Sequence, residues 1–410
     1  MKRYVIVGGG IAGVSCVEGI RSRDPEGEIT LVTAEETSNY GRPLISYYLQ
    51  GKTDLRRMSW RGEDFYEKNR VTALHAAAAE KLDPAAGEVT LSTGEKLPYD
   101  ALCVCTGSHP FSPRFEGLET VEKRFFFTTV ADALALEQTV TKESRVLVVG
   151  AGFIGLKCAE GLRDRAGSVT VCDLAEHAMS ANLDPDCAPI LERHLTKSGL
   201  RLLLGNTVTR FEGQKAHMQS GETLDFDVLV VAIGVRPETG LFAAAGGDVG
   251  RGIRVNERQE TGLPKIWAAG DCTESMDVSA GEPGVLAVLP NAAMQGFCAG
   301  ANMAGGAEVF DKGIKMNSIG FFGLHIMSAG SYTEPIYTEV TEDSCKKLFA
   351  KDGVLTGFIL IGDVARAGIY TSLIRERTPL ESVDLEALKK APSLLPLGRA
   401  YRAKKLGGAV

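Results

Sequence analysis

Two glycine-rich turns of the same pattern stand far apart in this chain of 410 residues, and each follows a short apolar run. The first, Gly8-Gly9-Gly10-Ile11-Ala12-Gly13, comes after Tyr4-Val5-Ile6-Val7. The second, Gly150-Ala151-Gly152-Phe153-Ile154-Gly155, comes after Val146-Leu147-Val148-Val149. A buried parallel strand, a glycine turn and a helix in this order bind a dinucleotide, because the glycines permit a tight turn, close approach of the pyrophosphate and close helix packing. One match alone could be an ordinary strand-to-helix turn, but two in matched contexts predict two bound dinucleotides.

Each unit also places an acidic residue at the end of its next strand, about twenty residues beyond the glycines. Glu35 comes soon after Ile29-Thr30-Leu31-Val32, and Asp173 directly follows Val169-Thr170-Val171-Cys172. A carboxylate at this point accepts hydrogen bonds from ribose hydroxyls and repels a 2′-phosphate. Because no arginine stands in the next several positions, Asp173 favours NAD over NADP. The alternative for either acid is an exposed side chain at a strand end.

Composition bounds the class of protein and its partners. The chain is 44% apolar and 24% charged, which is typical of a globular protein of two to three domains. The first strand begins by Tyr4, which leaves no room for a signal peptide, and no apolar run approaches the roughly 18 residues of a membrane span. We therefore expect a cytoplasmic protein without a membrane partner. A net charge of −7 gives no reason to expect nucleic acid.

The cysteines and histidines show no ligand or disulfide spacing. Nine cysteines are scattered along the chain, and this odd number without a framework predicts no structural disulfide. We interpret them as small core residues in a reducing compartment, including the close pair Cys103 and Cys105, which strand alternation places on one face. The six histidines have no metal-ligand spacing with one another or with cysteines, so neither a metal nor an iron–sulfur site is predicted.

A third strand-like unit, Lys265–Asp271, ends in Gly270-Asp271 and completes a set of motifs in a fixed order. With this set the chain resembles the FAD-dependent pyridine nucleotide-disulfide oxidoreductase superfamily over nearly its whole length. The markers, in chain order, are the first glycine turn with Glu35, Tyr40-Gly41-Arg42-Pro43 with Ser46, Thr106-Gly107, the second glycine turn with Asp173, Ala232-Ile233-Gly234-Val235-Arg236-Pro237, and Ala269-Gly270-Asp271.

The resemblance implies an α/β fold with two Rossmann-like dinucleotide-binding domains, the NAD domain being inserted in the FAD domain. Residues 1–112 and 246–315 would form the FAD-binding domain, and residues 113–245 the NAD-binding domain. Residues 316–410 would form a small C-terminal α+β domain. Within these domains we expect a helix over about 291–303, strands over 336–340, 345–350 and 355–361 with a turn at Asp352-Gly353, and a helix over about 366–375.

The resemblance also implies which residues hold the cofactors. The residues assigned to FAD are Gly8, Gly10, Ile11, Ala12, Gly13, Glu35, Arg42, Pro43, Ala77, Thr106, Gly107, Gly270 and Asp271. Those assigned to NAD(H) are Gly150, Gly152, Phe153, Ile154, Gly155, Asp173 and Gly234. Asp271 would accept hydrogen bonds from the ribityl chain, and the backbone near Ala77 would meet the adenine, although an alanine run is also typical of plain packing.

Differences from the motifs of the superfamily indicate which of its branches the chain resembles. Disulfide reductases carry a CxxxxC pair on the first helix, and the peroxidase, oxidase and coenzyme A-disulfide branches carry one cysteine near Arg42-Pro43; neither is present. The chain instead resembles the rubredoxin and ferredoxin reductase branch. Many ferredoxin reductases have Lys and Glu where this chain has Tyr47 and Lys157. We expect Lys157 to reach toward the nicotinamide and flavin and to tune them, the alternative being a solvent-facing helical lysine; we interpret Tyr47 as a packing residue.

The predicted activity is hydride transfer between NAD(H) and FAD, followed by transfer of single electrons to or from a separate carrier, rubredoxin or ferredoxin. Two alternatives stay open: an NADH oxidase acting on oxygen or a small molecule, and a non-catalytic NADH-sensing scaffold flavoprotein. An oligomer could form through the C-terminal domain.

The C-terminal segment differs in charge from the rest of the chain. Residues 364–410 hold nine basic and four acidic side chains, and the basic ones include Arg399, Arg402, Lys404 and Lys405. This excess predicts a docking surface for an acidic carrier. The alternative is a frayed basic tail.

Overall fold

The computed structural model describes residues 1–398, so the four basic residues Arg399, Arg402, Lys404 and Lys405 lie outside the described part. The chain divides into two compact units. The first consists of Met1–Leu174, Leu200–Met276 and Pro283–Asp311. The second consists of Ala175–Gly199, Asp277–Glu282 and the chain from Lys312 onward. The predicted domain boundaries stay a prediction, and the segment 175–199 belongs here to the second unit.

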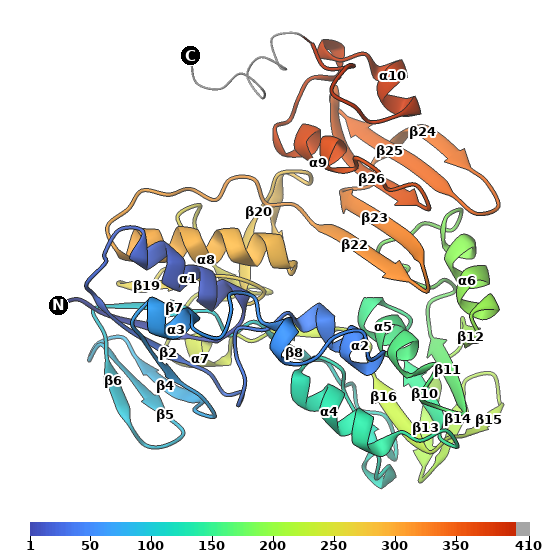
Figure 1. The fold of residues 1–410 in the computed structure, drawn as a ribbon, viewed down its shortest axis with the longest axis horizontal. Helices are drawn as coiled ribbons and strands as arrows, with labels where there is room; N and C mark the ends of the chain where they lie inside the picture. Colours follow the sequence, from blue (N-terminus) through green and yellow to red (C-terminus); the bar gives the residue numbers. More distant parts are fainter. Residues whose placement is uncertain (399–410) are drawn as a thin grey trace. The chain divides into compact units, whose positions relative to one another are not determined.

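The first unit contains two parallel sheets of five strands. The sheet that carries the first glycine turn has the strand order β19-β7-β1-β2-β3 (Figure 1). Its strands are β1 (Arg3–Val7), β2 (Glu28–Val32), β3 (Val71–Leu74), β7 (Ala101–Val104) and β19 (Ile266–Ala268). All four strand pairs are parallel. The carboxyl ends of these strands therefore meet at one edge, where ligands bind in open parallel sheets.

Two helices that are far apart in the sequence pack on this sheet as a close pair. They are α1 (Ile11–Arg21) and α8 (Leu289–Met303), and α8 covers the helix predicted over about 291–303 (Figure 1). A side chain at Gly296 would overlap the carbonyl of Ala12, and one at Gly300 would overlap the carbonyl of Cys16. The two glycines thus allow the backbones to touch, and α8 completes the core around α1.

The second parallel sheet repeats the first in the order β12-β11-β10-β16-β9. Its strands are β9 (Arg124–Phe125), β10 (Arg145–Val149), β11 (Ser168–Asp173), β12 (Arg201–Leu204) and β16 (Val228–Val231), with helices α4 (Val130–Thr139) and α5 (Phe153–Leu162). The four-residue runs of valine and leucine in β10 and β16 are buried, as expected for strands covered on both faces.

Both parallel sheets are fixed at their amino ends by the same ion pair. Arg3, the first residue of β1, donates from its backbone and its guanidinium to Asp100, the residue before β7. Arg145, the first residue of β10, does the same to Asp227, the residue before β16. The arginine lowers the pKa of each aspartate to about 2 by hydrogen bonding to its charged form.

Smaller sheets and short helices complete the fold. The antiparallel sheets are β4 (Ala79–Asp83), β5 (Glu88–Leu91) and β6 (Lys96–Pro98); β13 (Val208–Glu212), β14 (Lys215–Met218) and β15 (Thr223–Asp225); and the ribbon β8 (Ser108–Pro110) with β17 (Val235–Pro237). A further sheet contains β18 (Ile253–Arg254), β20 (Thr273–Asp277) and β21 (Glu282–Val285). The short α-helices are α2 (Ile45–Leu49), α3 (Phe65–Lys68) and α7 (Gly240–Ala244), and the 3₁₀ turns are Arg42–Leu44, Arg56–Met58, Leu118–Thr120 and Leu380–Ser382.

The second unit contains an antiparallel sheet in the order β22-β23-β26-β25-β24. Its strands are β22 (Met316–Phe321), β23 (Leu324–Gly330), β24 (Glu334–Val340), β25 (Cys345–Lys351) and β26 (Val354–Ile361), and its helices are α6 (Ala188–Lys197), α9 (Gly368–Arg375) and α10 (Leu385–Lys390). The last three strands, the turn at Asp352-Gly353 and α9 agree with the prediction; β22 and β23 were not predicted. The alternating side chains Leu348, Phe358 and Leu360 pack with Tyr370 of α9 in one core.

The expectation of no structural disulfide is wrong. Cys187, directly before α6, and Cys345, the first residue of β25, form a disulfide although 158 residues separate them. Spacing along the chain could not reveal a pair that only the fold brings together. The other seven cysteines are free and buried, including Cys103 and Cys105. Among the described helices, none combines the length and the apolar content that crossing a membrane requires.

Candidate functional site

The first glycine turn connects β1 directly to α1. Gly8 has a φ of +123°, and a side chain there would overlap the carbonyl of Cys105. A side chain at Gly13 would overlap the carbonyl of Gly8, so this glycine lets α1 lie against the strand. Gly10 differs, because an added Cβ would meet nothing within 4 Å. Gly10 caps α1 without a side-chain hydrogen bond, and the turn therefore offers helix N–H groups beside open space, as a pyrophosphate requires.

The acidic residue after β2 is fixed by two neighbours. Glu35 forms an ion pair with Arg42 and accepts a hydrogen bond from the hydroxyl of Tyr40 at 2.5 Å. Arg42 also donates to the carbonyl of Thr128 at 2.8 Å. A carboxylate has about four lone-pair directions, so Glu35 keeps acceptor capacity for ribose hydroxyls while its orientation is set. The predicted residues Glu35 and Arg42 thus lie together.

Ala77 lies at the same edge of the sheet. It is 4% exposed, and its N–H donates to the carbonyl of Thr33 at 2.9 Å. The neighbouring Ala76 donates to the carbonyl of Glu35 at 3.1 Å. The backbone beside Ala77 is therefore tied to the segment that carries Glu35.

The loops after β7 and β19 bring the remaining predicted FAD residues to this edge. A Cβ on Gly270 would lie 2.9 Å from the Cβ of Ala12, so Gly270 is in contact with the first turn. Ser108 donates to Asp271 at 3.4 Å. Burial raises the pKa of Asp271, while the charge of Arg42 and the bond from Ser108 lower it. Asp271 thus lies at the edge where the glycine turn lies.

Thr106 and Gly107 join the two parallel sheets. The hydroxyl of Thr106 donates to the carbonyl of Glu238 at 2.5 Å, and the N–H of Glu238 donates to the carbonyl of Gly107 at 2.8 Å. The strands β8 and β17 then pair in antiparallel register. These bonds tie the segment after β7 to the segment that follows β16.

The second glycine turn repeats the first. A side chain at Gly150, with φ +116°, would overlap the carbonyl of Ala232, and one at Gly155 would overlap the carbonyl of Gly150. Gly152 has nothing within 4 Å of an added Cβ and caps α5 without a side-chain hydrogen bond. These are the roles of Gly8, Gly13 and Gly10 in the first turn. Phe153 and Ile154 follow as the first residues of α5.

Asp173 is positioned by the turn itself. Its Oδ2 accepts a hydrogen bond from the N–H of Ala151 at 2.6 Å, so the carboxylate stands beside the glycine turn. Gly234, with φ +117°, follows β16 on the adjacent strand, and an added Cβ there would meet nothing within 4 Å. The predicted NAD residues therefore lie at the carboxyl edge of the second sheet, and the backbone at Gly152 and Gly234 borders open space.

Lys157 does not face solvent. Its side chain is 12% exposed and forms an ion pair with Glu160, which is 5% exposed, three residues later on α5. The Lys157 ammonium also lies 4.7 Å from the ring centroid of Tyr47 on α2. A buried cation of this kind persists only with a partner, since an unpaired charge away from water is costly. The role of Glu160 was not predicted, although a Lys–Glu pair at a spacing of three on a helix signals such a contact.

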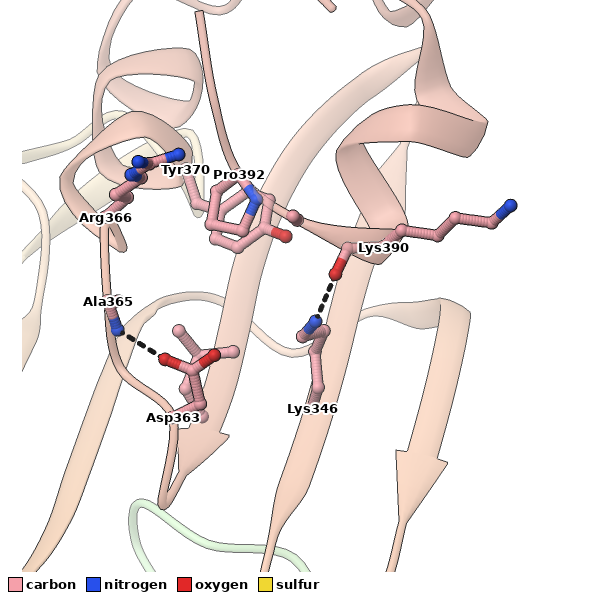
Figure 2. Close-up of a pocket in the computed structure, with 9 residues that line it drawn as sticks. Lys346, Asp363, Ala365, Arg366, Tyr370, Lys390 and Pro392 are labelled. Carbon is pink, nitrogen blue, oxygen red and sulfur yellow. Dashed lines mark hydrogen bonds between the residues drawn. The ribbon is translucent and has the colours of Figure 1, made fainter.

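A separate cavity of about 260 Å³ lies in the second unit, and no predicted site residue lines it (Figure 2). Its lining includes Lys346, Asp363, Arg366 and Tyr370. The Lys346 ammonium donates to the carbonyl of Lys390 at 2.9 Å, and Asp363 accepts from the N–H of Ala365 at 3.0 Å. Both charges are thus already bonded to backbone. No group of three or more metal-ligating side chains occurs among residues 1–398.

Comparisons with known proteins match two families along the chain. The family described as pyridine nucleotide-disulphide oxidoreductase matches residues 2–296, and the rubredoxin NAD+ reductase C-terminal domain matches residues 316–378. The NADH-dependent phenylglyoxylate dehydrogenase subunit epsilon of Aromatoleum evansii is 32% identical over 391 residues, which cover 92% of each chain. An NADH oxidase of Methanocaldococcus jannaschii is 30% identical over 394 residues, covering 88% of this chain and 87% of the relative.

Two further curated relatives, both from Bacillus subtilis, are longer, and the chain spans about half of their length (49% and 50%). Among solved structures, the covalent putidaredoxin reductase–putidaredoxin complex contains a chain with a TM-score of 0.87 and 24% identity, with 95% of each chain covered. At this identity the likeness concerns the fold.

Proposed function

The chain belongs to the pyridine nucleotide-disulphide oxidoreductase family, and from this membership we propose that it passes electrons between NAD(H) and a small iron-containing carrier protein by way of FAD. The chain is an NAD(H)-dependent flavoprotein oxidoreductase. What we propose is that its electron-transfer partner is a small carrier protein. The observation that supports it most is the pair of matched glycine turns in one unit, joined to a C-terminal segment that matches a rubredoxin reductase domain. The carrier would be a rubredoxin or a ferredoxin.

The chain's own residues account for binding both cofactors. Gly10 and the uncapped start of α1 would hold the FAD pyrophosphate, with Glu35 on the adenosine ribose and Asp271 on the ribityl hydroxyls. Gly152 and Asp173 would hold NAD(H) in the same manner on the second sheet. When bound, FAD supplies the chemistry that turns a two-electron hydride exchange into single-electron steps. The protein supplies position and exclusion of water, without an acid–base residue.

Lys157 is the residue proposed to tune this exchange. Its ammonium is buried between Glu160 on α5 and the Tyr47 ring on α2. A cation in a shielded place stabilises negative charge that develops nearby, and a reduced flavin carries such charge. Glu160 holds the ammonium in place.

The direct test is rapid mixing. The protein reduced by NADH is mixed with rubredoxin, with ferredoxin or with oxygenated buffer, and reoxidation of the flavin absorbance is followed. If the proposed function is correct, the rate of flavin reoxidation by a carrier should be at least about tenfold higher than the rate with oxygen. Faster reoxidation by oxygen than by any carrier would support the alternative of an NADH oxidase, which the named activity of the Methanocaldococcus relative favours. Slow reduction by NADH, with a change of oligomer, would support the sensing scaffold.

A salt series tests whether the basic C-terminal segment docks the carrier. Raising the salt from roughly 50 to 300 mM shortens the Debye length and should slow carrier reduction steeply, while NADH-to-flavin transfer barely changes. Reversing the charges of Arg399, Arg402, Lys404 and Lys405 should give the same loss at low salt. A carrier reaction that neither treatment changes would eliminate this docking surface. The cytoplasmic location and an oligomer through the C-terminal domain stay predictions.

A further inference from the structure

The sheet of the second unit has two covered faces. One face carries Leu348, Phe358 and Leu360 and packs on α9 and α10. The strand register places Cys345 and Lys347 on the opposite face, beside Ile361 and Ile359 of β26. Ile359 and Ile361 are 0% and 1% exposed, so this face is also buried.

Polar contacts show that the segment 175–199 lies on this second face. Tyr332 donates to the carbonyl of Asn182 at 2.8 Å, and His194 of α6 contacts the carbonyl of Phe321 at 3.0 Å. Arg193 donates to the carbonyl of Glu342 at 2.6 Å. The contacts extend along the segment from Asn182 to His194.

The centre of this contact is ionic and covalent. Lys347, which is 5% exposed, pairs with Asp184 and with Asp186, the latter at 2.5 Å. Directly beside them, Cys187 and Cys345 have a Cα–Cα distance of 6.0 Å, within the range that a disulfide bridges without backbone movement. Both cysteines are buried, at 0% and 2% exposure.

The geometry distinguishes this pair from the other cysteines. Cys187 is the N-cap of α6 and lies within bonding reach of Cys345, on a distant strand. The sulfurs of Cys103 and Cys105 also lie 3.4 Å apart, but these residues are only two positions apart, so a bond between them would join no distant segments. Burial raises the pKa of Cys158 and of Cys272, the latter to about 12, so these thiols stay protonated.

We propose that Cys187 and Cys345 are a reversible thiol–disulfide modification site that locks the segment 175–199 onto the C-terminal sheet. The oxidant is a hydroperoxide. The Cys187 thiolate attacks one oxygen of hydrogen peroxide, the O–O bond breaks, and a sulfenic acid and a hydroxide result; the hydroxide takes up the proton that the thiol had lost and becomes the first water. The Cys345 thiol then attacks the sulfenic sulfur, forming the S–S bond and releasing a second water. Two thiols lose two electrons and two protons, and the peroxide takes them up; a dithiol reductant reverses the step.

The lock has a defined place in the chain. The segment begins two residues after Asp173 and ends one residue before Leu200, where the first unit resumes. It therefore forms the crossover between β11 and β12 of the second parallel sheet. Oxidation would fix this crossover on the C-terminal sheet covalently, whereas in the reduced form only the noncovalent contacts, the pairs with Lys347 among them, would hold it.

The test compares two redox states of the full-length flavoprotein. The protein is fully reduced and desalted, and one half is treated with hydrogen peroxide. Free thiols are alkylated, and the peptides are mapped by mass spectrometry. We expect a Cys187–Cys345 cross-link in the treated half only, and we expect the variant Cys298→Ser, which leaves the pair intact, to behave as the parent does. Oxidation at other cysteines while Cys187 and Cys345 stay alkylated would overturn the proposal.

Limited trypsin cleavage at Arg193 and Lys197 measures the lock itself. We expect cleavage in the oxidised form to be slower by about tenfold, because the lock raises the free energy of local opening. The variants Cys187→Ser and Cys345→Ser should be cleaved at the reduced rate with or without peroxide. Equal rates for oxidised and reduced parent protein would refute the lock, and this comparison needs no variant to fold. The readout does not depend on electron transfer, so its failure leaves the proposed function untouched.

Discussion

The two nucleotide-binding regions of the first unit share a backbone and differ in their side chains. Gly8, Gly10 and Gly13 have the same three roles as Gly150, Gly152 and Gly155. The carboxylates that follow are held differently. Glu35 is bound by side chains, Arg42 and Tyr40, whereas Asp173 is bound by the backbone N–H of Ala151 within the turn. We therefore expect the glycine pattern to set where each dinucleotide lies, and the surroundings of the carboxylate to differ between the two cofactors.

The largest effect is expected from breaking the shared backbone. Gly155→Ala should destabilise the protein by about 3 kcal/mol or more, because the methyl group overlaps the backbone of Gly150. At Gly152 an added methyl group meets open space, so Gly152→Ala should lower the free energy of unfolding by about 1 kcal/mol or less. Denaturant unfolding measures both. Gly13→Ala and Gly10→Ala form the matched pair in the first region, and equal losses within either pair would contradict the assigned roles.

The second effect concerns cofactor choice. The parent protein should use NADH over NADPH by about 10- to 100-fold in kcat/KM, since Asp173 opposes a 2′-phosphate at a cost of about 1–3 kcal/mol. Asp173→Asn keeps an oxygen for the N–H of Ala151 and should remove most of this preference. Glu35→Gln, the matched change in the first region, should leave the NADH to NADPH ratio unchanged. A parent protein that uses both cofactors equally would eliminate this role of Asp173.

A third effect separates the charge of Lys157 from its packing. The double variant Lys157→Met with Glu160→Leu removes both buried charges together, so its stability should change by less than about 1–2 kcal/mol. If the ammonium lies near the flavin, the two-electron potential should fall by about 30 mV, which corresponds to about 1.4 kcal/mol. A redox titration against a dye of known potential measures this shift. An unchanged potential would assign the pair to structure alone.

The smallest effect is common to both regions. Because their arginine partners lower the pKa of Asp100 and Asp227 to about 2, the folded state binds protons there less readily than the unfolded chain does. The stabilisation is complete above about pH 4 and is lost as the pH falls through about 2. It should be small, since the aspartate side chains are 39% and 30% exposed. Asp100→Asn and Asp227→Asn should each flatten the acid limb of a stability profile; a flat parent profile would contradict the shift.

Short-range sequence patterns predicted individual strands, turns and helices. The strand, turn and helix around each glycine motif, α8 and the last three strands of the second unit follow from short-range periodicity. The segment Met316–Phe321 lacks clear alternation and contains a glycine, and β22 was therefore missed. The glycine turns and both carboxylates lie where the sequence predicts. The pairing of Arg42 with Glu35 depends on side-chain directions that spacing alone does not give. The pairing of Lys157 with Glu160 has a local signal, the spacing of three on a helix.

The contacts that the sequence could not predict are long-range. Cys187 and Cys345 are 158 residues apart, and neither has a neighbouring cysteine to suggest a pair. The face that they join is completed by a segment that sequence analysis places in the NAD-binding domain. When distant parts of the chain cover the two faces of one sheet, the hydrophobic periodicity of the sequence does not show which segment covers which face.

The placement of α8 has a consequence for synthesis of the chain on the ribosome. The first parallel sheet takes its last strand, β19, from Ile266–Ala268 and its close helix from Leu289–Met303. The second sheet has all its strands by Val231. The nascent chain therefore completes the inserted region first, while α1 exposes the surface that Gly296 and Gly300 of α8 later contact. The region of the first glycine turn thus begins first in the sequence but is completed last.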